Sequence, residues 1–426
     1  MLGSKPTDID VADAAASKPL AGLRVLDLTV ALSGPYGTLI LAALGAEVIK
    51  VEMPGGSDIA RFNPPFCTPE GNMHLGALEE GDYSLSMMAR NRAKKSVELD
   101  LKDPRGREVF RRMAAEADIV FENLSDGVVE RLGVDYESLR DVNPRLIYCS
   151  LSGLGNPSRF PGVKAMDITV QAVSGAMDTT GDAGGPPMRF GLPISDLLAP
   201  LYAVIGVQAA LRAREQTGRG QRVDVSMLDC LASLLPFEHL DVMQQFGFPP
   251  RSGNQHARLA PFGVFRTSDG YVSIAAASES WMQGVFDALG RPELIEDPRF
   301  SSRGPRVANS TELNRLIEAW TSVRSTDEVI HELAERRGVP CVPVRSAAEV
   351  LSDKALIEAG VLAKLEHPFG GTVDAVGGGI PIRLSGSDTR LVGRARPLGA
   401  DTDGVLREMA GLSDDEIAEL RSEGVI

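Results

Sequence analysis

Alternating and helical patterns of hydrophobic residues predict that the chain opens with a β–α–β unit. Residues 23–29 (LRVLDLT) alternate as a strand does, and Ser33-Gly34-Pro35 breaks the pattern. Apolar residues then follow at helical spacing over 36–44, and residues 47–52 (EVIKVE) form a second strand. A strand, a helix and a strand within about 30 residues imply a parallel sheet with helices packed against it.

The same pattern returns further along the first half of the chain. Asp103 followed by Pro104 is typical of a helix start, because Asp caps a helix and proline fits its first turn. An apolar helix is predicted over about 197–214. Short strands are predicted at 119–122, 146–151 and 222–226. The first half is therefore predicted to be an α/β fold, doubly wound in outline.

The character of the sequence changes near residue 235. Residues 262–266 and 271–276 flank Ser268-Asp269-Gly270, a hairpin turn signal. Helices are predicted near 280–289, 311–321 and 326–337, and a short strand at 341–344. This part is typical of a smaller α+β domain.

Composition and charge exclude several classes of function. Hydrophobic residues make up 43% and charged residues 24% of the 426 residues, as in an ordinary globular chain, and the net charge is −14. Such an acidic surface argues against general binding of nucleic acid or anionic membranes, so an anionic ligand needs a local basic site.

The sequence shows no evident signal peptide, membrane span, disulfide framework or zinc-binding motif. The first 18 residues resemble a disordered leader without the apolar core of a signal peptide. The apolar stretch 197–211, at ~15 residues, is shorter than a membrane span and indicates a buried helix. Four scattered cysteines predict neither a disulfide framework nor a zinc site. We therefore expect a cytoplasmic protein with no bound metal.

Familiar site motifs are missing, and this directs attention to carboxylates. The sequence contains no G-x-G-x-x-G, no Walker A loop, no H-E-x-x-H and no G-x-S-x-G. The five histidines are isolated along the chain and are more typical of surface or core positions. Acid/base chemistry would then rest mainly on Asp and Glu.

Asp196 is the best placed of these acids, because it stands at the start of the apolar helix after a glycine-containing loop. One interpretation is a simple N-cap. The other is a nucleophile, which the helix dipole holds ionised. Asp167, at the start of another helical stretch, also fits an N-cap. The basic run 90–95 (RNRAKK) fits either a solvated face or a contact to a phosphate-bearing ligand.

Six stretches, taken in order and spacing, resemble the family III CoA-transferases from about Pro19 to Leu235 and more weakly to the end. They are LAGLRVLDLT, LGAEVIKVE, NRAKKSVELDLKDPRGRE, ADIVFEN, GVVERLGVDYESLRDVNPRLIYCSLSGLG and TGRGQRVDVSMLD. The resemblance implies that Asp196 attacks a donor acyl-CoA, giving an aspartyl–acyl anhydride and then an aspartyl-CoA thioester. An acceptor carboxylate completes the cycle. It implies CoA thioester as a co-substrate, no permanently bound cofactor, and contacts to CoA from Leu99, Lys102, Asn123, Arg131, Lys164 and Met227.

Two other functions remain open from the sequence. The α-methylacyl-CoA racemases resemble the same blocks and keep the same Asp, but pair it with a His that precedes the second acid. Here that position is Met166, and a thioether cannot exchange a proton. The alternative is thus a 2-methylacyl-CoA racemase or epimerase. A non-catalytic CoA-ester-binding protein, with Asp196 only a cap, is the third possibility.

Departures from formyl-CoA transferase argue against formate and oxalate as substrates. A glycine-rich lid is not evident in residues 252–256 (SGNQH), and Leu32 and Met53 stand where that enzyme has polar or basic groups. A larger carboxylate, with succinyl-CoA as donor, is expected instead.

The resemblance also implies an interlocked homodimer with a Rossmann-like large domain. In this layout residues 1–18 are a leader and 19–232 the first part of the large domain. Residues 233–344 form the small α+β domain, and 345–426 return to the large domain. The expected partners are an acyl-CoA, a carboxylate and a second copy of the chain, with no nucleic acid and no membrane.

Overall fold

The computed structural model describes residues 18–426, so residues 1–17 of the predicted leader lie outside the described residues. The chain divides into two compact units. The large unit comprises the chain up to Ser174, Gly191–Ser233 and Leu351–Ile426, and the small unit comprises Gly175–Phe190 and Leu234–Val350. Residues 175–190, which the expected division counts with the large domain, fall in the small unit.

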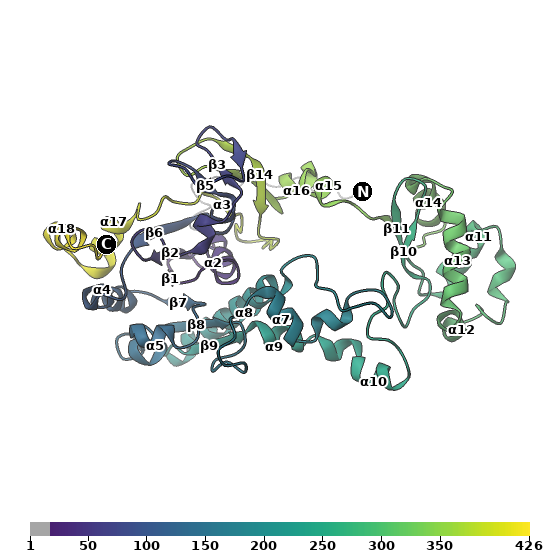
Figure 1. The fold of residues 1–426 in the computed structure, drawn as a ribbon, viewed down its shortest axis with the longest axis horizontal. Helices are drawn as coiled ribbons and strands as arrows, with labels where there is room; N and C mark the ends of the chain where they lie inside the picture. Colours follow the sequence, from purple (N-terminus) through teal and green to yellow (C-terminus); the bar gives the residue numbers. More distant parts are fainter. Residues whose placement is uncertain (1–17) are drawn as a thin grey trace. The chain divides into compact units, whose positions relative to one another are not determined.

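A six-stranded parallel sheet forms the centre of the large unit, which confirms the predicted α/β class (Figure 1). In spatial order its strands are β6 (Lys94–Glu98), β2 (Glu47–Glu52), β1 (Arg24–Asp27), β7 (Ile119–Glu122), β8 (Ile147–Ser152) and β9 (Arg222–Ser226). From β1 the chain first adds strands on one side and then, from β7, on the other. The carboxyl ends of β1 and β7 therefore form the switch point of the topology, where open α/β sheets bind ligands.

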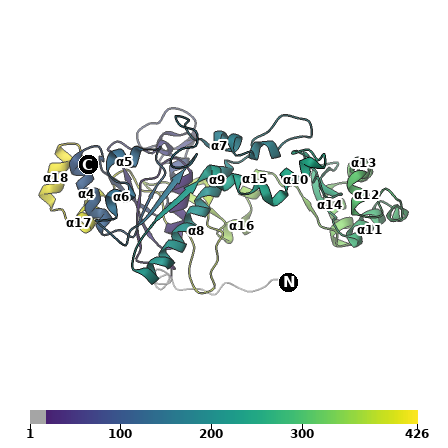
Figure 2. The same cartoon turned by 90° about the horizontal axis from the view of Figure 1, so that it is seen from below.

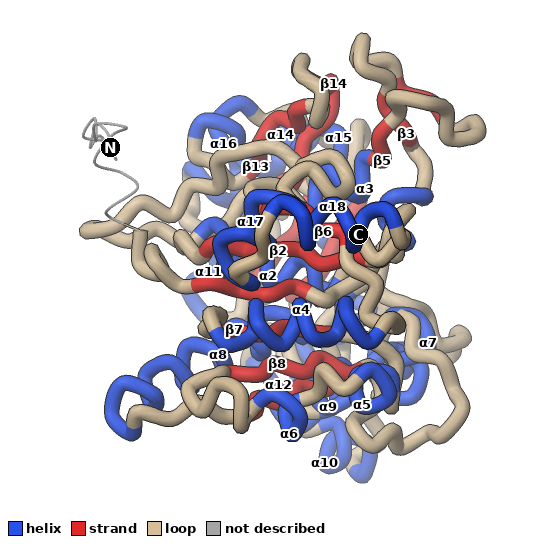
Figure 3. The backbone as a smooth tube through the Cα atoms, turned by 90° about the vertical axis from the view of Figure 1, so that its left-hand side faces the viewer, coloured by secondary structure: helices blue, strands red, loops and turns tan. Residues whose placement is uncertain are grey.

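One face of the sheet packs on helices from both ends of the chain. Figure 3 shows α17 (Thr402–Ala410) and α4 (Pro104–Ala115) in front of the strands, and α18 (Asp414–Ser422) continues this layer. Side chains of these helices and of alternate strand residues share one buried core. As predicted, Asp103 caps α4 by accepting a hydrogen bond from the Arg105 N–H at 2.8 Å, with Pro104 in the first turn.

The opposite face carries α2 (Ser33–Ala43), which starts earlier than expected. Ser33-Gly34-Pro35 was predicted to be a break, but these residues form the first turn of the helix. Proline is tolerated there because the first turn has no intrahelical acceptor for its missing N–H. The absence of a Cβ on Gly37 lets the helix lie close to Phe121 of β7 and to Pro200.

The helix α8 (Ile194–Thr217), the long teal helix in Figure 2, packs beside α2 and against β8 and β9. It has 24 residues and is longer than the predicted apolar stretch, because polar turns extend it at both ends. Among the described residues, it is the one helix long and apolar enough to cross a membrane. A core helix meets the same criteria, and 44% of its most apolar window is buried.

Smaller elements complete the large unit. Short antiparallel pairings join β3 (Phe66–Cys67) with β4 (Met73–His74) and β5 (Tyr83–Ser84), and β13 (Leu362–Glu366) with β14 (Thr372–Gly378). Together with α3 (Leu85–Arg90) they bury a satellite core. The remaining helices are α5 (Val128–Leu132), α6 (Tyr136–Leu139), α7 (Asp167–Val173), α9 (Met227–Ala232) and α16 (Lys354–Glu358). Along the sequence, α15 (Ala347–Leu351) includes the boundary at which the chain passes from the small unit back to the large one.

The small unit contains the predicted hairpin, in which β10 (Phe262–Arg266) pairs antiparallel with β11 (Tyr271–Ala275). The strand β12 (Cys341–Pro343) joins the other side of β11. Helices cover this sheet and share its buried core. They are α11 (Glu279–Ala288), α12 (Arg303–Ala308), α13 (Ser310–Thr321) and α14 (Thr326–Ile330), the last continuing into a π-helical turn at His331–Glu335. The helix α10 (Leu240–Gln245) has no residue in this core.

Candidate active site

Asp196 lies in the first turn of α8 but does not cap it. The helix begins at Ile194, and the capping position is Pro193, which makes no side-chain hydrogen bond. The simple N-cap interpretation of Asp196 is therefore wrong. The pKa of its carboxyl group is set by burial and by the charges of Asp167 and Arg90. In the described part of the chain, no hydrogen bond to this carboxyl group is found. This half-buried carboxylate is free to meet a ligand.

Asp167 does the capping that sequence reasoning assigned to Asp196. It is the first residue of α7, yet its Oδ1 accepts hydrogen bonds from the N–H of Ser195 at 2.9 Å and from the Ser195 hydroxyl at 2.7 Å. Its Oδ2 accepts a third from the Gln171 amide at 2.7 Å. Asp167 thus caps the neighbouring helix α8, and its charge lies beside Asp196.

Burial and the Asp167 charge raise the pKa of Asp196 to about 6, and the Arg90 guanidinium opposes this rise. The sequence suggested that the helix dipole would hold this group ionised, but desolvation and a like charge outweigh it. A carboxylate with a raised pKa binds a proton more readily than an ordinary one. It also attacks an acyl carbon more readily, because the same oxygen lone pair forms the bond in both cases. At neutral pH most of it is still ionised.

Arg90 links Asp196 to the loop that follows β1. Its Nη1 donates a hydrogen bond to the carbonyl of Ala31 at 2.9 Å. Burial lowers the pKa of Arg90, while the charges of Asp58 and Asp196 support its charged form. Arg90 was not predicted as a site residue, although it belongs to the basic run 90–95.

The loop after β1 is held in an unusual backbone conformation. Ala31 has a φ of 68°, in the left-handed region that costs a non-glycine residue about 1 kcal/mol. Its N–H donates to Asp58 Oδ1 at 2.8 Å. The side chain of Asn123 accepts from the N–H of Val30 at 2.8 Å and donates to its carbonyl at 3.0 Å. The β1 and β7 loops are thereby joined at the switch point.

Buried ion pairs support this loop from beneath. Lys50 pairs with Asp58 at 2.8 Å, and Lys94 pairs with Asp27 at 2.9 Å, all four side chains being buried. Burial alone would raise the pKa of Asp27, but the charges of Lys94 and Lys50 bring it below its ordinary value. The interpretation of the run 90–95 as a solvated face is therefore wrong for Lys94, which is buried and paired with Asp27.

The predicted CoA contacts divide into two groups. Leu99, Asn123 and Met227 each directly follow a strand, β6, β7 and β9, so they lie at the carboxyl edge of the parallel sheet. Leu99 is fully buried, and its N–H donates to the carbonyl of Glu52 at 2.7 Å. The basic residues Lys102, Arg131 and Lys164 have exposed positions on the segments that leave this edge.

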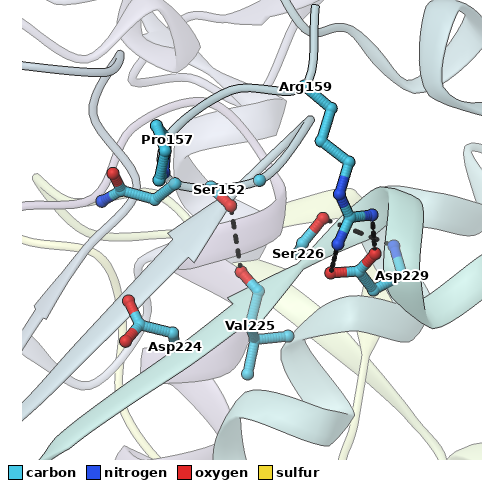
Figure 4. A pocket seen from close by; sticks show the side chains of 9 residues that line it. Ser152, Pro157, Arg159, Asp224, Val225, Ser226 and Asp229 are labelled. Atoms are coloured by element: carbon cyan, nitrogen blue, oxygen red, sulfur yellow. Dashed lines mark hydrogen bonds and ion pairs between the residues drawn. The ribbon is translucent and has the colours of Figure 1, made fainter.

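A pocket of about 390 Å³ opens beside Met227, where β8 and β9 end (Figure 4). Figure 4 shows Arg159 paired with Asp229, and the Ser152 hydroxyl facing the carbonyl of Val225, to which it donates at 3.4 Å. Asp196 is not among its lining residues. The pocket therefore belongs to the outer part of the carboxyl edge and does not contain the nucleophile candidate.

Metal-ligating groups do not gather in the described residues. No cluster of three or more His, Cys, Asp or Glu side chains is found between residues 18 and 426. All four cysteines are free and buried. The reactive group that the site offers is therefore the carboxylate of Asp196, which does not serve as a helix cap.

This chain is similar to known proteins both in sequence and in fold. The sequence model of one family, described as CoA-transferase family III, matches residues 20–402. A succinyl-CoA:mesaconate CoA-transferase of Haloarcula hispanica is 37% identical over 88% of this chain and 92% of its own length. The human succinyl-CoA:glutarate CoA-transferase is 32% identical over 96% of this chain and 90% of its own. A crystal structure of a CAIB/BAIF family protein from Brucella suis superposes with a TM-score of 0.78 at 35% identity, covering 92% of this chain and all of that one.

Proposed function

Because the chain belongs to CoA-transferase family III, we propose that it moves CoA from an acyl-CoA thioester to a free carboxylic acid through covalent intermediates on Asp196. The observation that carries this proposal is a half-buried carboxylate in the first turn of α8, free of hydrogen bonds and with its pKa raised to about 6. Carboxylate nucleophiles that form covalent intermediates are an established class.

In the first half-reaction, an Asp196 oxygen attacks the thioester carbonyl carbon. The carbonyl π electrons move onto oxygen, return to re-form C=O, and expel CoA as its thiolate, which leaves an aspartyl–acyl anhydride. The thiolate then attacks the Asp196 carbonyl carbon and releases the donor acid as a carboxylate, which leaves an aspartyl-CoA thioester. The acceptor carboxylate repeats these two steps in reverse. No proton is transferred, so the reaction needs no general base.

Two features of the site suit this chemistry. The intermediates survive only where water is excluded, and Asp196 is partly desolvated. Its raised pKa also makes its carboxylate a better nucleophile than one with an ordinary pKa of about 4.

Coenzyme A is proposed to lie along the carboxyl edge of the sheet, with contacts from Leu99, Lys102, Asn123, Arg131, Lys164 and Met227. Exposed Lys102, Arg131 and Lys164 are suited to phosphate oxygens. They would supply the local positive charge that an acidic protein needs to hold an anionic ligand.

A racemase is the weaker candidate. Racemisation requires a group that exchanges the α-proton, and Met166 stands where a histidine would do this. Met166 precedes α7 and is 65% exposed, and its thioether has no proton to exchange. A non-catalytic binding protein is disfavoured because Asp196 does not serve as a cap.

We propose succinyl-CoA as the donor and a dicarboxylic acid larger than oxalate as the acceptor. The two relatives described above are named for succinyl-CoA with mesaconate or glutarate, and others of similar identity are named for acetyl-CoA or formyl-CoA with oxalate. The proposal of a larger acid therefore rests on two side chains of this sequence. Leu32 and Met53 stand where formyl-CoA transferase has polar or basic groups, and neither side chain can donate a hydrogen bond to a small acid such as oxalate.

We also propose a cytoplasmic homodimer. On α8, the side chains of Leu201, Tyr202 and Ile205 are exposed in the single chain, and in the small unit so are those of Phe237 and Phe246. Apolar side chains of this size are typical of surfaces covered by a partner. Light scattering coupled to gel filtration tests this, since a dimer has twice the mass of the 45.4 kDa chain.

The function itself is tested by mixing purified enzyme with succinyl-CoA and a panel of carboxylates, and separating the CoA esters by chromatography. A transferase forms a new CoA ester in amounts equal to the succinate released. A racemase instead exchanges the α-proton of a 2-methylacyl-CoA with deuterated solvent. If no acid on the panel gains CoA and no exchange occurs, the binding-protein alternative is favoured.

A further inference from the structure

The hydroxyl of Ser33 is a buried polar group that the described residues leave without a partner. Ser33 is the first residue of α2 and is only 4% exposed. Its Oγ has no contact with solvent and no hydrogen-bond partner. Buried hydroxyls are nearly always paired, so one that is not calls for a physical reason.

The N-terminus of α2 around Ser33 is also uncapped. The capping position is Leu32, whose side chain has no acceptor, and Pro35 has no N–H. Tyr36 donates its N–H to the carbonyl of Leu32 at 2.9 Å. For the N–H groups of Ser33 and Gly34, no acceptor is found within residues 18–426. Two backbone donors and one hydroxyl therefore gather at the positive end of an 11-residue helix.

This helix end and the start of α8, where Asp196 lies, belong to two helices that pack together. Both α2 and α8 begin at the carboxyl edge of the sheet, since α2 follows β1 and α8 leads back to the start of parallel strand β9. The two helices therefore run in the same direction. They touch where a Cβ built on Gly37 would lie 3.5 Å from the Cβ of Pro200.

Ser33 and Asp196 each stand one turn before that contact. Ser33 precedes Gly37 by four residues, and Asp196 precedes Pro200 by four, so each shares the face on which the helices meet. Arg90 gives independent support, because it interacts with the Asp196 charge and donates to the carbonyl of Ala31, two residues before Ser33.

We propose that the Ser33 hydroxyl, with the N–H groups of Ser33 and Gly34, receives the acyl oxygen of the thioester when Asp196 attacks. This inference rests on the proposed function. As the Asp196 oxygen bonds to the acyl carbon, the carbonyl π electrons become a lone pair on oxygen, and Ser33 donates a hydrogen bond to it while keeping its proton. When the C–S bond breaks, the pair returns to the carbonyl and CoA leaves as thiolate.

The role explains why the hydroxyl is unpaired in the free protein. A donor that acts on a charge present only in the transition state must not be committed to a protein acceptor. Rotation about χ1 turns the hydroxyl between staggered positions without moving the backbone. Shielding from water strengthens the hydrogen bond that it finally makes.

Ser33→Ala tests the proposal in the full-length enzyme. We expect kcat for CoA transfer to fall by about 10- to 100-fold with KM for the acyl-CoA within about twofold, because a donor used in the transition state affects kcat. We expect an unchanged or slightly higher Tm, because no partner loses its hydrogen bond. A kcat within twofold of wild type overturns the proposal, and so does a variant that fails to fold, since it would reveal a structural partner.

Ser150→Ala is the matched control. Ser150 is buried, but its hydroxyl donates to Glu122. Its loss should lower Tm and leave kcat unchanged, the reverse of the pattern expected for Ser33→Ala. A wild-type enzyme that transfers no CoA would contradict the proposed function, whereas an active wild type matched by an equally active Ser33→Ala would contradict this inference alone.

Discussion

Asp167 accepts hydrogen bonds from both the N–H and the hydroxyl of Ser195, the residue before Asp196. This one relationship holds α7 against the start of α8, relieves Asp196 of any capping role, and sets a like charge beside it. Burial and this charge together raise the pKa of Asp196 to about 6. The reactivity of one carboxylate is thus set by the structural role of another.

Replacing Asp167 by Asn should lower the pKa of Asp196, because the variant removes a neighbouring negative charge and keeps an amide oxygen as acceptor for Ser195. The acid limb of the kcat/KM profile, which reports the free enzyme, should move from about pH 6 to lower pH. A profile measured between pH 4.5 and 8 checks this. An unmoved acid limb would mean that Asp167 does not act on the nucleophile.

Replacing Arg90 by Met should have the opposite effect on the same profile. Its positive charge holds the pKa of Asp196 down, so its removal should move the acid limb above pH 6 and lower kcat/KM at pH 6 by several-fold. Arg90→Lys is the matched control, because it keeps the charge and should keep the limb near its wild-type position. If both variants shift the limb equally, the charge of Arg90 is not the cause.

Asp196→Asn should stabilise the protein while it abolishes transfer. The pKa of Asp196 is raised in the folded state from 3.8 to about 6, so its ionisation opposes folding. The stability that this group contributes is present at acidic pH and is lost as the pH rises from about 4 through 6. At pH 7.5 the variant should gain up to about 3 kcal/mol in the free energy of unfolding, and at pH 4 almost nothing.

Urea unfolding at the two pH values measures this difference. A gain that is the same at pH 4 and pH 7.5 would show that the pKa of Asp196 is not raised. A loss of stability at pH 7.5 would show that its carboxylate makes favourable contacts.

Lys102→Ala should weaken CoA binding without changing the fold. Its exposed ammonium is proposed to meet a phosphate, so the dissociation constant of CoA should rise by about three- to tenfold at low salt and by less at 0.5 M salt. Lys364→Ala, on the exposed side of β13, is a suitable control. Calorimetric titration with free CoA gives both constants, and equal values for wild type and Lys102→Ala would remove Lys102 from the site.

Local signals predicted the framework well. The start of α4 was correct because Asp103 and Pro104 act within one turn of the chain. The limits of β2, β7 and β9 were correct because each is a short segment rich in β-branched and other apolar residues, which is typical of a strand in a parallel sheet. The start of α2 at Ser33 was not predicted, because glycine and proline usually interrupt a helix. Gly34 and Pro35 lie in the first turn of α2, where both residues are tolerated.

The electrostatics of the site could not be predicted from local signals. Lys94 and Asp27 are separated by 67 residues along the chain, and sequence gives no sign that they pair in the core. Asp167 and Ser195 are 28 residues apart and meet only because α7 packs beside α8. The sequence identified Asp196 through its place before an apolar helix, but only the packing shows that another residue does the capping.

The proposed transfer requires a covalent bond to Asp196, and the direct measurement is to trap it. The enzyme is incubated with succinyl-CoA alone, quenched with hydroxylamine, digested and examined by mass spectrometry. The peptide that contains Asp196 should carry a hydroxamate in place of the carboxylate, and the Asp196→Asn variant treated alike should not. Transfer activity together with an unmodified Asp196, or a hydroxamate on a different residue, would contradict the account.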